Sequence, residues 1–213
     1  MGNLILVRHA TTAHSASGRN LGQGSDPPLA EAGMDLAASL GTALAMELAE
    51  LPHDEIRLIS SPALRCRQTM AHVASGIELD PDDVEIAPGL IELDYGAWDG
   101  LTAAECLARD PQLRARWEAD PYATRCPDGE SGENVAVRAT AVLDPVVSWL
   151  VADRARCAIV VAHNHVNRVV LCRLLGWPMR DYRRRLAADP GAYSMVTFGN
   201  GNPVIRRFNV PGR

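Results

Sequence analysis

The 213-residue sequence predicts an α/β fold built on a mostly parallel sheet. Short runs of aliphatic or β-branched residues recur along the chain, and patterns typical of helices lie between them. The runs are Leu4–Val7, Ile56–Ser60, Val84–Ile86, Ala158–Ala162, Ser194–Phe198 and Val204–Phe208. We expect parallel pairing because parallel neighbours need a long crossover, which is usually a helix.

Several of the intervening helices have recognisable starts or faces. Leucines at four-residue spacing predict a core-facing helix within Glu31–Leu51. Ser61 predicts an N-cap for a helix over Pro62–Ala74, with the proline in its first turn. Thr102 opens a capping-box pattern, and Ser131 is placed to cap a long helix.

Length and charge limit the classes of protein that fit this chain. With 47% hydrophobic residues and no long linker or repeat, we expect a single domain over residues 1–213. A net charge of −5 gives no overall attraction to nucleic acid or to an anionic membrane. We therefore expect small-molecule partners, no nucleic acid and no membrane.

The cysteines and the amino terminus bear on where the protein works. Five cysteines are scattered without a CxxC pair, and their odd number argues against a disulfide framework. The run Leu4–Val7 is too short for a signal peptide, and no apolar run approaches the roughly 20 residues that span a bilayer. A reduced, cytoplasmic setting is the prediction.

Residues that suit anions follow three of the predicted strands. Arg8 and His9 follow the first, Arg65 lies in the first turn of the helix after the second, and His163 follows Ala158–Ala162. The carboxyl ends of parallel strands meet at one edge of a sheet, where helix N-termini present free N–H groups. We expect a cationic pocket for a phosphate group there, covered by the Gly/Ser/Pro-rich loop Ser15–Pro28.

The chain also resembles a known family along almost its whole length. In order, the motifs are LVRHATT, SSPALRCRQT, LIELDYGAWDGLT, PDGES and VVAHNH. They resemble the successive motifs of the histidine phosphatase superfamily, branch 1, which includes the cofactor-dependent phosphoglycerate mutases. The resemblance implies a phosphoglycerate mutase-like fold, a three-layer α/β/α sandwich, and chemistry without a metal or other cofactor.

The resemblance assigns roles to five residues. His9 would be the nucleophile, and an imidazole of pKa about 6.5 is largely neutral at pH 7. The side chains of Arg8, Arg65 and His163 would hold the phosphoryl oxygens. Glu92 would act as general acid and base. Burial would raise its pKa and the arginines would lower it, so the sequence leaves the sign of the shift open.

The remaining contacts and the specificity elements are less closely defined. We predict substrate contacts from Asn164, Ser15 and Gly22. Asn164 stands where the family has glycine, and this departure bears on the substrate preference. The leaving group is expected to meet the loop Ser15–Pro28 and the region Arg109–Glu133, including Trp117, Tyr122 and Arg125.

Some polar residues admit a second interpretation. His163 and His165 would share a face of a strand, as metal ligands can, but no compact set of further ligands accompanies them, so we expect no metal. For His165, Asn167 and Arg168, a structural role and a substrate contact both stay open. The run Arg183–Arg185 is predicted to be a solvated face.

Taken together, the motifs predict a metal-independent phosphomonoesterase, a phosphatase that acts on small phosphate esters through a phosphohistidine and releases inorganic phosphate. Phosphoglycerate mutase activity is the first alternative, and the short segments between motifs favour hydrolysis over it. A non-catalytic phospholigand-binding regulator is the second alternative, and the presence of both His9 and Glu92 weighs against it. A homodimer stays open.

Overall fold

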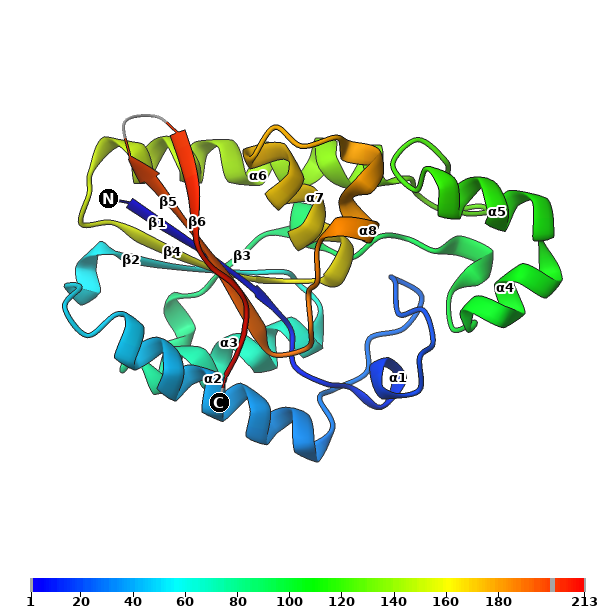
Figure 1. The fold of residues 1–213 in the computed structure, drawn as a ribbon. Helices are drawn as coiled ribbons and strands as arrows, with labels where there is room; N and C mark the ends of the chain where they lie inside the picture. Colours follow the sequence, from blue (N-terminus) through cyan, green and yellow to red (C-terminus); the bar gives the residue numbers. More distant parts are fainter. Residues whose placement is uncertain (1, 200–201, 213) are drawn as a thin grey trace.

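The computed structural model describes residues 2–199 and 202–212, and their strands form one six-stranded sheet (Figure 1). The strands are β1 (Gly2–Arg8), β2 (Ile56–Ser60), β3 (Glu85–Ile86), β4 (Cys157–Ala162), β5 (Ala192–Gly199) and β6 (Asn202–Pro211). Their order is β3-β2-β4-β1-β5-β6. The first four strands in this order pair in parallel, whereas β5 and β6 are antiparallel. The predicted α/β class with a mostly parallel sheet is confirmed.

Helices cover both faces of this sheet. They are α1 (Ala13–Ala16), α2 (Glu31–Glu47), α3 (Leu64–Gly76), α4 (Ala103–Arg109), α5 (Pro111–Ala119), α6 (Gly132–Ala152), α7 (Asn164–Leu174) and α8 (Tyr182–Arg185). In Figure 1, α2 and α3 lie below the sheet, and α6 and α7 lie above it. The segments that carry α1, α4 and α5 extend beyond the carboxyl ends of β1, β2 and β4. The fold is therefore the three-layer sandwich that the resemblance implied.

Alternation along the central strands divides the core into two layers. In β1, Ile5 and Val7 belong to the apolar cluster that contains the α2 and α3 side chains. Leu4 and Leu6 belong to the cluster on the other face, with α6 and α7. Every residue of β4 is buried, as expected for a strand covered on both faces. Burial of both faces fixes the register of these strands, and with it the positions of the residues that follow them.

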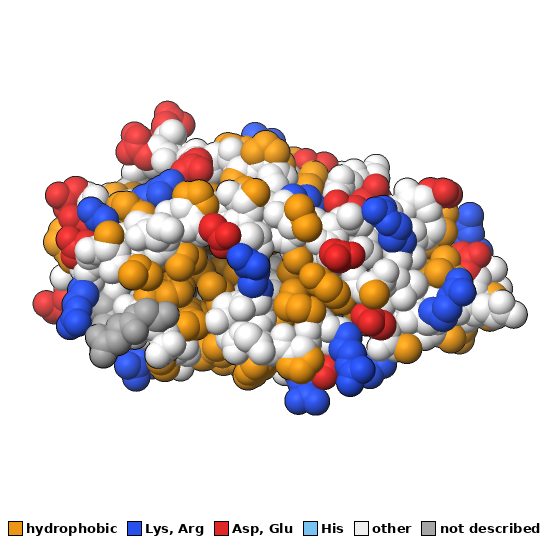
Figure 2. Space-filling model, turned by 90° about the horizontal axis from the view of Figure 1, so that it is seen from above, with side chains coloured by type: hydrophobic (Ala, Val, Ile, Leu, Met, Phe, Trp, Pro, Cys, Tyr) orange, Lys and Arg blue, Asp and Glu red, His pale blue; other side chains and the backbone are white. Residues whose placement is uncertain are grey.

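Helix α6 is the one helix of the described residues that is long and apolar enough to cross a membrane. Its residues Val135, Leu143 and Leu150 are buried against the sheet, while Asp144 lies on its exposed side. These contacts are those of a core helix. Seen from above, the α6–α7 side of the molecule shows a hollow lined by apolar side chains, with acidic and basic groups interspersed around it (Figure 2).

The helix starts were predicted with mixed success. Thr102 forms a capping box, as predicted, and Ser131 caps the long helix α6, as predicted, by forming a capping box too. The prediction for Ser61 is wrong, because α3 begins at Leu64 and its N-cap residue is Ala63, whose side chain makes no capping hydrogen bond. The Ser61 hydroxyl instead lies 2.8 Å from Nε2 of His163. The predicted helix within Glu31–Leu51 ends at Glu47.

Candidate active site

The ends of β1, β2 and β4 bring distant parts of the chain together. The His9 N–H donates to the Ala162 carbonyl at 3.0 Å, which places His9 beside the residue that follows β4. The rings of His9 and His163 are 5.2 Å apart between centroids, at an interplanar angle of 65°. From the other side, the Gly191 N–H donates to the carbonyls of Arg8 and His9 at 3.1 and 3.3 Å. The two imidazoles thus lie side by side at the sheet edge.

His9 has the state that a nucleophile needs. Its ring is almost fully buried, and Nδ1 lies 2.8 Å from the carbonyl oxygen of Ala10. A carbonyl oxygen only accepts, so Nδ1 carries the proton and Nε2 keeps its lone pair. Burial lowers the pKa of His9 well below its usual value, and the cations Arg8 and Arg65 lower it further. The ring is therefore neutral at pH 7.

Two guanidinium groups, those of Arg8 and Arg65, act electrostatically on this imidazole. Arg65 is 1% exposed, and its Nη2 donates to the Gly22 carbonyl at 3.1 Å while Nη1 lies 3.4 Å from Asp26 Oδ1. Arg8 donates through Nη1 to the Ala188 carbonyl at 2.6 Å. Within the described residues, the Nε of each arginine is buried and has no hydrogen-bond partner. Buried donors of this kind call for an acceptor, and an anion between the two arginines would supply it.

The second imidazole is held by Ser61 and Arg65. Nδ1 of His163 lies 3.4 Å from Arg65 Nη2, which can only donate, so Nε2 carries the proton and donates to Ser61 Oγ at 2.8 Å. Burial, then the neighbouring His9 and arginines, lower the pKa of His163. A hydroxyl can also donate, so Ser61 can serve either tautomer of His163. Sequence reasoning missed this role because it assigned the hydroxyl to a helix cap.

Glu92 lies in the segment between β3 and α4 and is 3% exposed. Its carboxylate accepts from the N–H groups of Leu93 at 2.8 Å and His165 at 3.2 Å. Burial raises the pKa of Glu92, while these two hydrogen bonds and the Arg65 and Arg8 cations oppose the shift. The pKa is raised overall, so burial outweighs the opposing influences. This answers the question that the sequence left open. The carboxyl group keeps its proton to higher pH than an exposed glutamate would.

Two ion pairs hold the surroundings of these groups. Arg138 donates to the Glu92 carbonyl at 2.9 Å and pairs with Glu130 at 2.9 Å. Asp26 accepts from the Leu64 N–H at 2.8 Å and from Arg65. Glu130 and Asp26 therefore act through the arginines that they orient.

A cavity of about 210 Å³ opens in front of His9. Four further predicted residues line it, Arg8, Ser15, Glu92 and Asn164. Arg65 and His163 do not line this cavity, and neither does Gly22, which lines another cavity together with Arg65. Its N–H donates to Asp99 Oδ1 at 3.0 Å and its carbonyl accepts from Arg65, so both backbone groups are already used.

Six lining residues were not predicted individually. They are Gly18, Arg19, Asn20, Leu21, Tyr95 and Arg183. The prediction of a solvated face is wrong for Arg183, whose guanidinium lies 4.5 Å from the centroid of the Trp117 ring. Nothing in the run of three arginines distinguishes Arg183 from its neighbours, because the contact depends on where α8 docks.

The aromatic residues behind the cavity form a wall. Trp117 is 1% exposed and packs on Tyr95, Trp98 and His165. A direct contact between Trp117 and the leaving group was predicted, but this burial leaves its ring no access to the cavity. His165 lies on α7 rather than on a strand, and its ring nitrogens bond the hydroxyls of Tyr95 at 2.7 Å and Tyr182 at 2.6 Å. Of its two open roles, the structure gives His165 the structural one.

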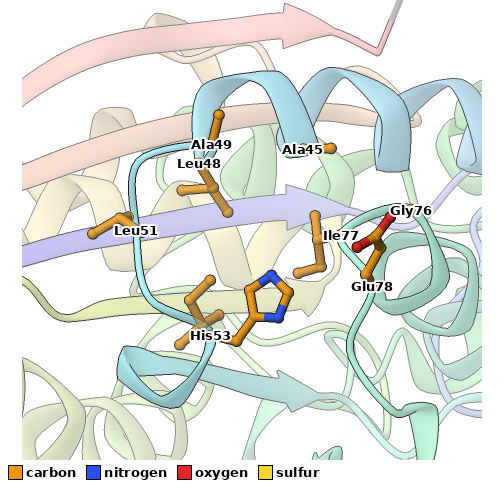
Figure 3. Close-up of a pocket in the computed structure, with 9 residues that line it drawn as sticks. Ala45, Leu48, Ala49, Leu51, His53, Gly76, Ile77 and Glu78 are labelled. Atoms are coloured by element: carbon orange, nitrogen blue, oxygen red, sulfur yellow. The ribbon is translucent and has the colours of Figure 1, made fainter.

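Two further observations concern other sites. Residues 2–199 and 202–212 contain no group of three or more His, Cys, Asp or Glu side chains that could hold a metal ion. A second cavity, of about 200 Å³, lies between the end of α2 and the end of α3 (Figure 3). Its walls include Ala45, Leu48 and Ile77, with His53 and Glu78 as the charged or titratable members. With no arginine in its lining, it does not suit a phosphate group.

Comparison with known proteins identifies the family. Residues 4–211 match the model of the histidine phosphatase superfamily (branch 1). The chain belongs to this superfamily. The resemblance drawn from the sequence motifs is confirmed.

Named members of the superfamily include phosphatases of several kinds. Phosphoserine phosphatase 1 of Hydrogenobacter thermophilus is 29% identical over 212 residues, covering 99% of this chain and 93% of that protein. An acid phosphatase of Mycobacterium tuberculosis is 30% identical over 213 residues, covering 98% and 91%. The structure of a mycobacterial glucosyl-3-phosphoglycerate phosphatase in complex with VO3 has a TM-score of 0.82 at 24% identity, covering 99% and 100%. This last likeness concerns the fold.

Proposed function

We propose that this protein is a phosphomonoesterase that hydrolyses small phosphate esters through a phosphohistidine at His9, without a metal ion. The observation that carries the proposal is a neutral, buried imidazole between two arginines whose Nε donors have no partner among the described residues. The phosphatase names of the superfamily members support it.

In the first step, Nε2 of His9 attacks the phosphorus of the bound ester. The N–P bond forms as the bond from phosphorus to the leaving oxygen breaks. The guanidinium groups of Arg8 and Arg65 hold the non-bridging oxygens and offset their charge. Glu92 gives its proton to the leaving oxygen, so an alcohol departs and a carboxylate remains. The Ala10 carbonyl stabilises the positive charge that the phosphorylated ring carries, by accepting from Nδ1.

In the second step, water attacks the phosphorus of the phosphohistidine. The Glu92 carboxylate takes a proton from this water as the O–P bond forms and the N–P bond breaks. Inorganic phosphate leaves, the imidazole is neutral again, and the glutamic acid is restored. Every proton and bond is accounted for by residues of this chain and one water molecule.

The test is the release of inorganic phosphate from a panel of phosphate esters, with and without a chelator. We expect release that the chelator leaves unchanged, that His9→Ala abolishes and that His53→Ala, an exposed-histidine control, retains. Enzyme stopped during turnover should carry an acid-labile, base-stable phosphoryl label, absent from His9→Ala. Undiminished release by His9→Ala would contradict the mechanism.

The same panel separates the alternatives. A mutase would move the phosphoryl group between hydroxyls of phosphoglycerate and release little phosphate. A non-catalytic regulator would bind phosphate esters without turnover. The cytoplasmic setting and the homodimer stay predictions from the sequence.

A further inference from the structure

Three arginines, Arg8, Arg19 and Arg183, line the cavity together with Glu92, the proposed proton donor. Arg19 has a carboxylate partner of its own. Arg168 is outside this lining, on α7, and burial is the largest cause that lowers its pKa. The charges of Arg8 and Arg183 lower it further, so Arg8, Arg168 and Arg183 lie within electrostatic reach of one another.

Carboxylates offset the charges of these arginines unequally, and Glu92 and Asp189 both act on Arg8. Arg183 pairs with Glu118 at 2.7 Å, but Glu118 also pairs with Arg114. Arg168 makes no ion pair and no hydrogen bond within the described part of the chain, and its Nε is buried without a partner. Glu92 acts on Arg168 at longer range, but no ion pair joins the two among the described residues. A largely buried cation without a paired carboxylate is unfavourable, and a bound anion would relieve it.

A second polar group on the same helix face also lacks a partner. Asn164 stands one turn before Arg168, so both side chains lie on one side of α7. Asn164 lines the cavity, and within residues 2–199 and 202–212 its Oδ1 is buried with no hydrogen-bond partner. An amide oxygen accepts hydrogen bonds, so this atom calls for a donor on a ligand. It indicates independently that a polar ligand belongs on this side of the cavity.

We propose that the leaving group of the substrate carries a second anionic group, a carboxylate or a further phosphate, which Arg168 and Arg183 bind. The inference rests on the proposed function, since it concerns the same cavity. The phosphoryl group to be transferred occupies Arg8 and Arg65, and the second anion offsets the charge that remains. Such substrates should react with higher kcat/KM than esters of the same shape with a neutral leaving group.

The test compares matched esters by phosphate release. 3-Phosphoglycerate and glycerol 3-phosphate share a carbon skeleton and differ in a carboxylate against a hydroxymethyl group. The bisphosphate and monophosphate of propane-1,3-diol test a second phosphate in the same way. A charge-assisted hydrogen bond corresponds to roughly a ten- to hundredfold effect, so we expect a preference of that size in at least one pair.

Substitutions test which residues cause the preference for anionic esters. Arg168→Gln and Arg183→Gln should each reduce the ratio of kcat/KM for the anionic ester over its neutral partner about tenfold or more. Arg168→Lys, which keeps the charge, should restore part of that ratio. Arg173→Gln is the matched control, because Arg173 lies on the same helix, exposed, and pairs with Asp144. Thermal unfolding of each variant checks that it is folded.

The outcomes separate the two proposals. If the parent protein hydrolyses neutral and anionic esters equally well, the second anion site is wrong and the phosphatase stands. A preference that both glutamine variants retain would also overturn it. If Arg168→Gln fails to fold, Arg183→Gln and the parental preference still decide. If no ester of the panel is hydrolysed, the proposed function and this inference fall together.

Discussion

Acidification should destabilise this protein, because three imidazoles are buried in their neutral form. Burial lowers the pKa values of His9, His163 and His165 well below that of a free histidine. Between the ordinary pKa near 6.5 and these lowered values, the unfolded chain takes up protons that the folded protein does not. The stability that these groups confer is therefore present above pH 6.5 and is lost as the pH falls through that window.

The size of the effect follows from the number of groups. Lowering the pH from 7.0 to 5.5 reduces the free energy of unfolding by about 1.3 kcal/mol for one such histidine and by about 4 kcal/mol for three. Glu92 acts in the opposite direction, because its raised pKa makes the folded protein the better proton acceptor above about pH 4.5. It offsets at most about 2 kcal/mol over the same interval. The net loss of about 2 to 4 kcal/mol is a large part of the stability of an ordinary domain.

The assay is urea unfolding at pH 7.0 and 5.5 in buffers without phosphate, since a bound anion would add its own stabilisation. His9→Asn should reduce the difference between the two pH values by about 1.3 kcal/mol, the share of one histidine. His53→Asn, which changes an exposed ring, should leave the difference as it is. Equal stability at both pH values in the parent would refute the reasoning.

Three further substitutions test the site and the loops around it. Glu92→Gln should slow alkyl phosphates by about 10²- to 10⁴-fold and activated aryl phosphates far less, because good leaving groups need no proton. For alkyl esters, the parent's rate should fall as pH rises through the raised Glu92 pKa, and the variant should lose this dependence. Ser61→Ala, which removes the hydroxyl beside the second imidazole, should lower kcat/KM about tenfold in steady-state kinetics, and unchanged kinetics would show that the contact is incidental. Gly96→Ala should destabilise the fold by about 1 to 3 kcal/mol or more in urea, since φ is +52° and a Cβ would lie 2.1 Å from a carbonyl oxygen. Gly18→Ala shares the positive φ but meets nothing within 4 Å in the described residues, so it should cost less, and equal losses would rule out the steric argument.

The sheet and the ends of its strands could be predicted because they depend on local pattern. Aliphatic runs locate the strands, and the parallel arrangement that they imply brings Arg8, His9 and His163 to one edge. The register then follows from burial on both faces, with Arg8 opposite Ala162. The positions of these residues could therefore be predicted without any knowledge of side-chain packing.

The remainder depends on contacts between distant segments. The sequence around Ser61 fits a helix cap, but the hydroxyl bonds an imidazole 102 positions later, which no local rule contains. Arg183 became a cavity residue because α8 packs against the segment of Trp117. For Glu92, two opposing influences on the pKa were known from the sequence, but only the extent of burial shows which is larger.

The hydrogen bonds from Gly191 to the carbonyls of Arg8 and His9 tie the opening strand to a late part of the chain. During synthesis on a ribosome, His9 is made well before β4 and β5, which supply its neighbours on both sides. The proposed phosphate pocket therefore cannot be complete until β5 has emerged. Deleting β5 would disrupt this pocket without removing His9, Glu92 or the arginines proposed to hold the ester.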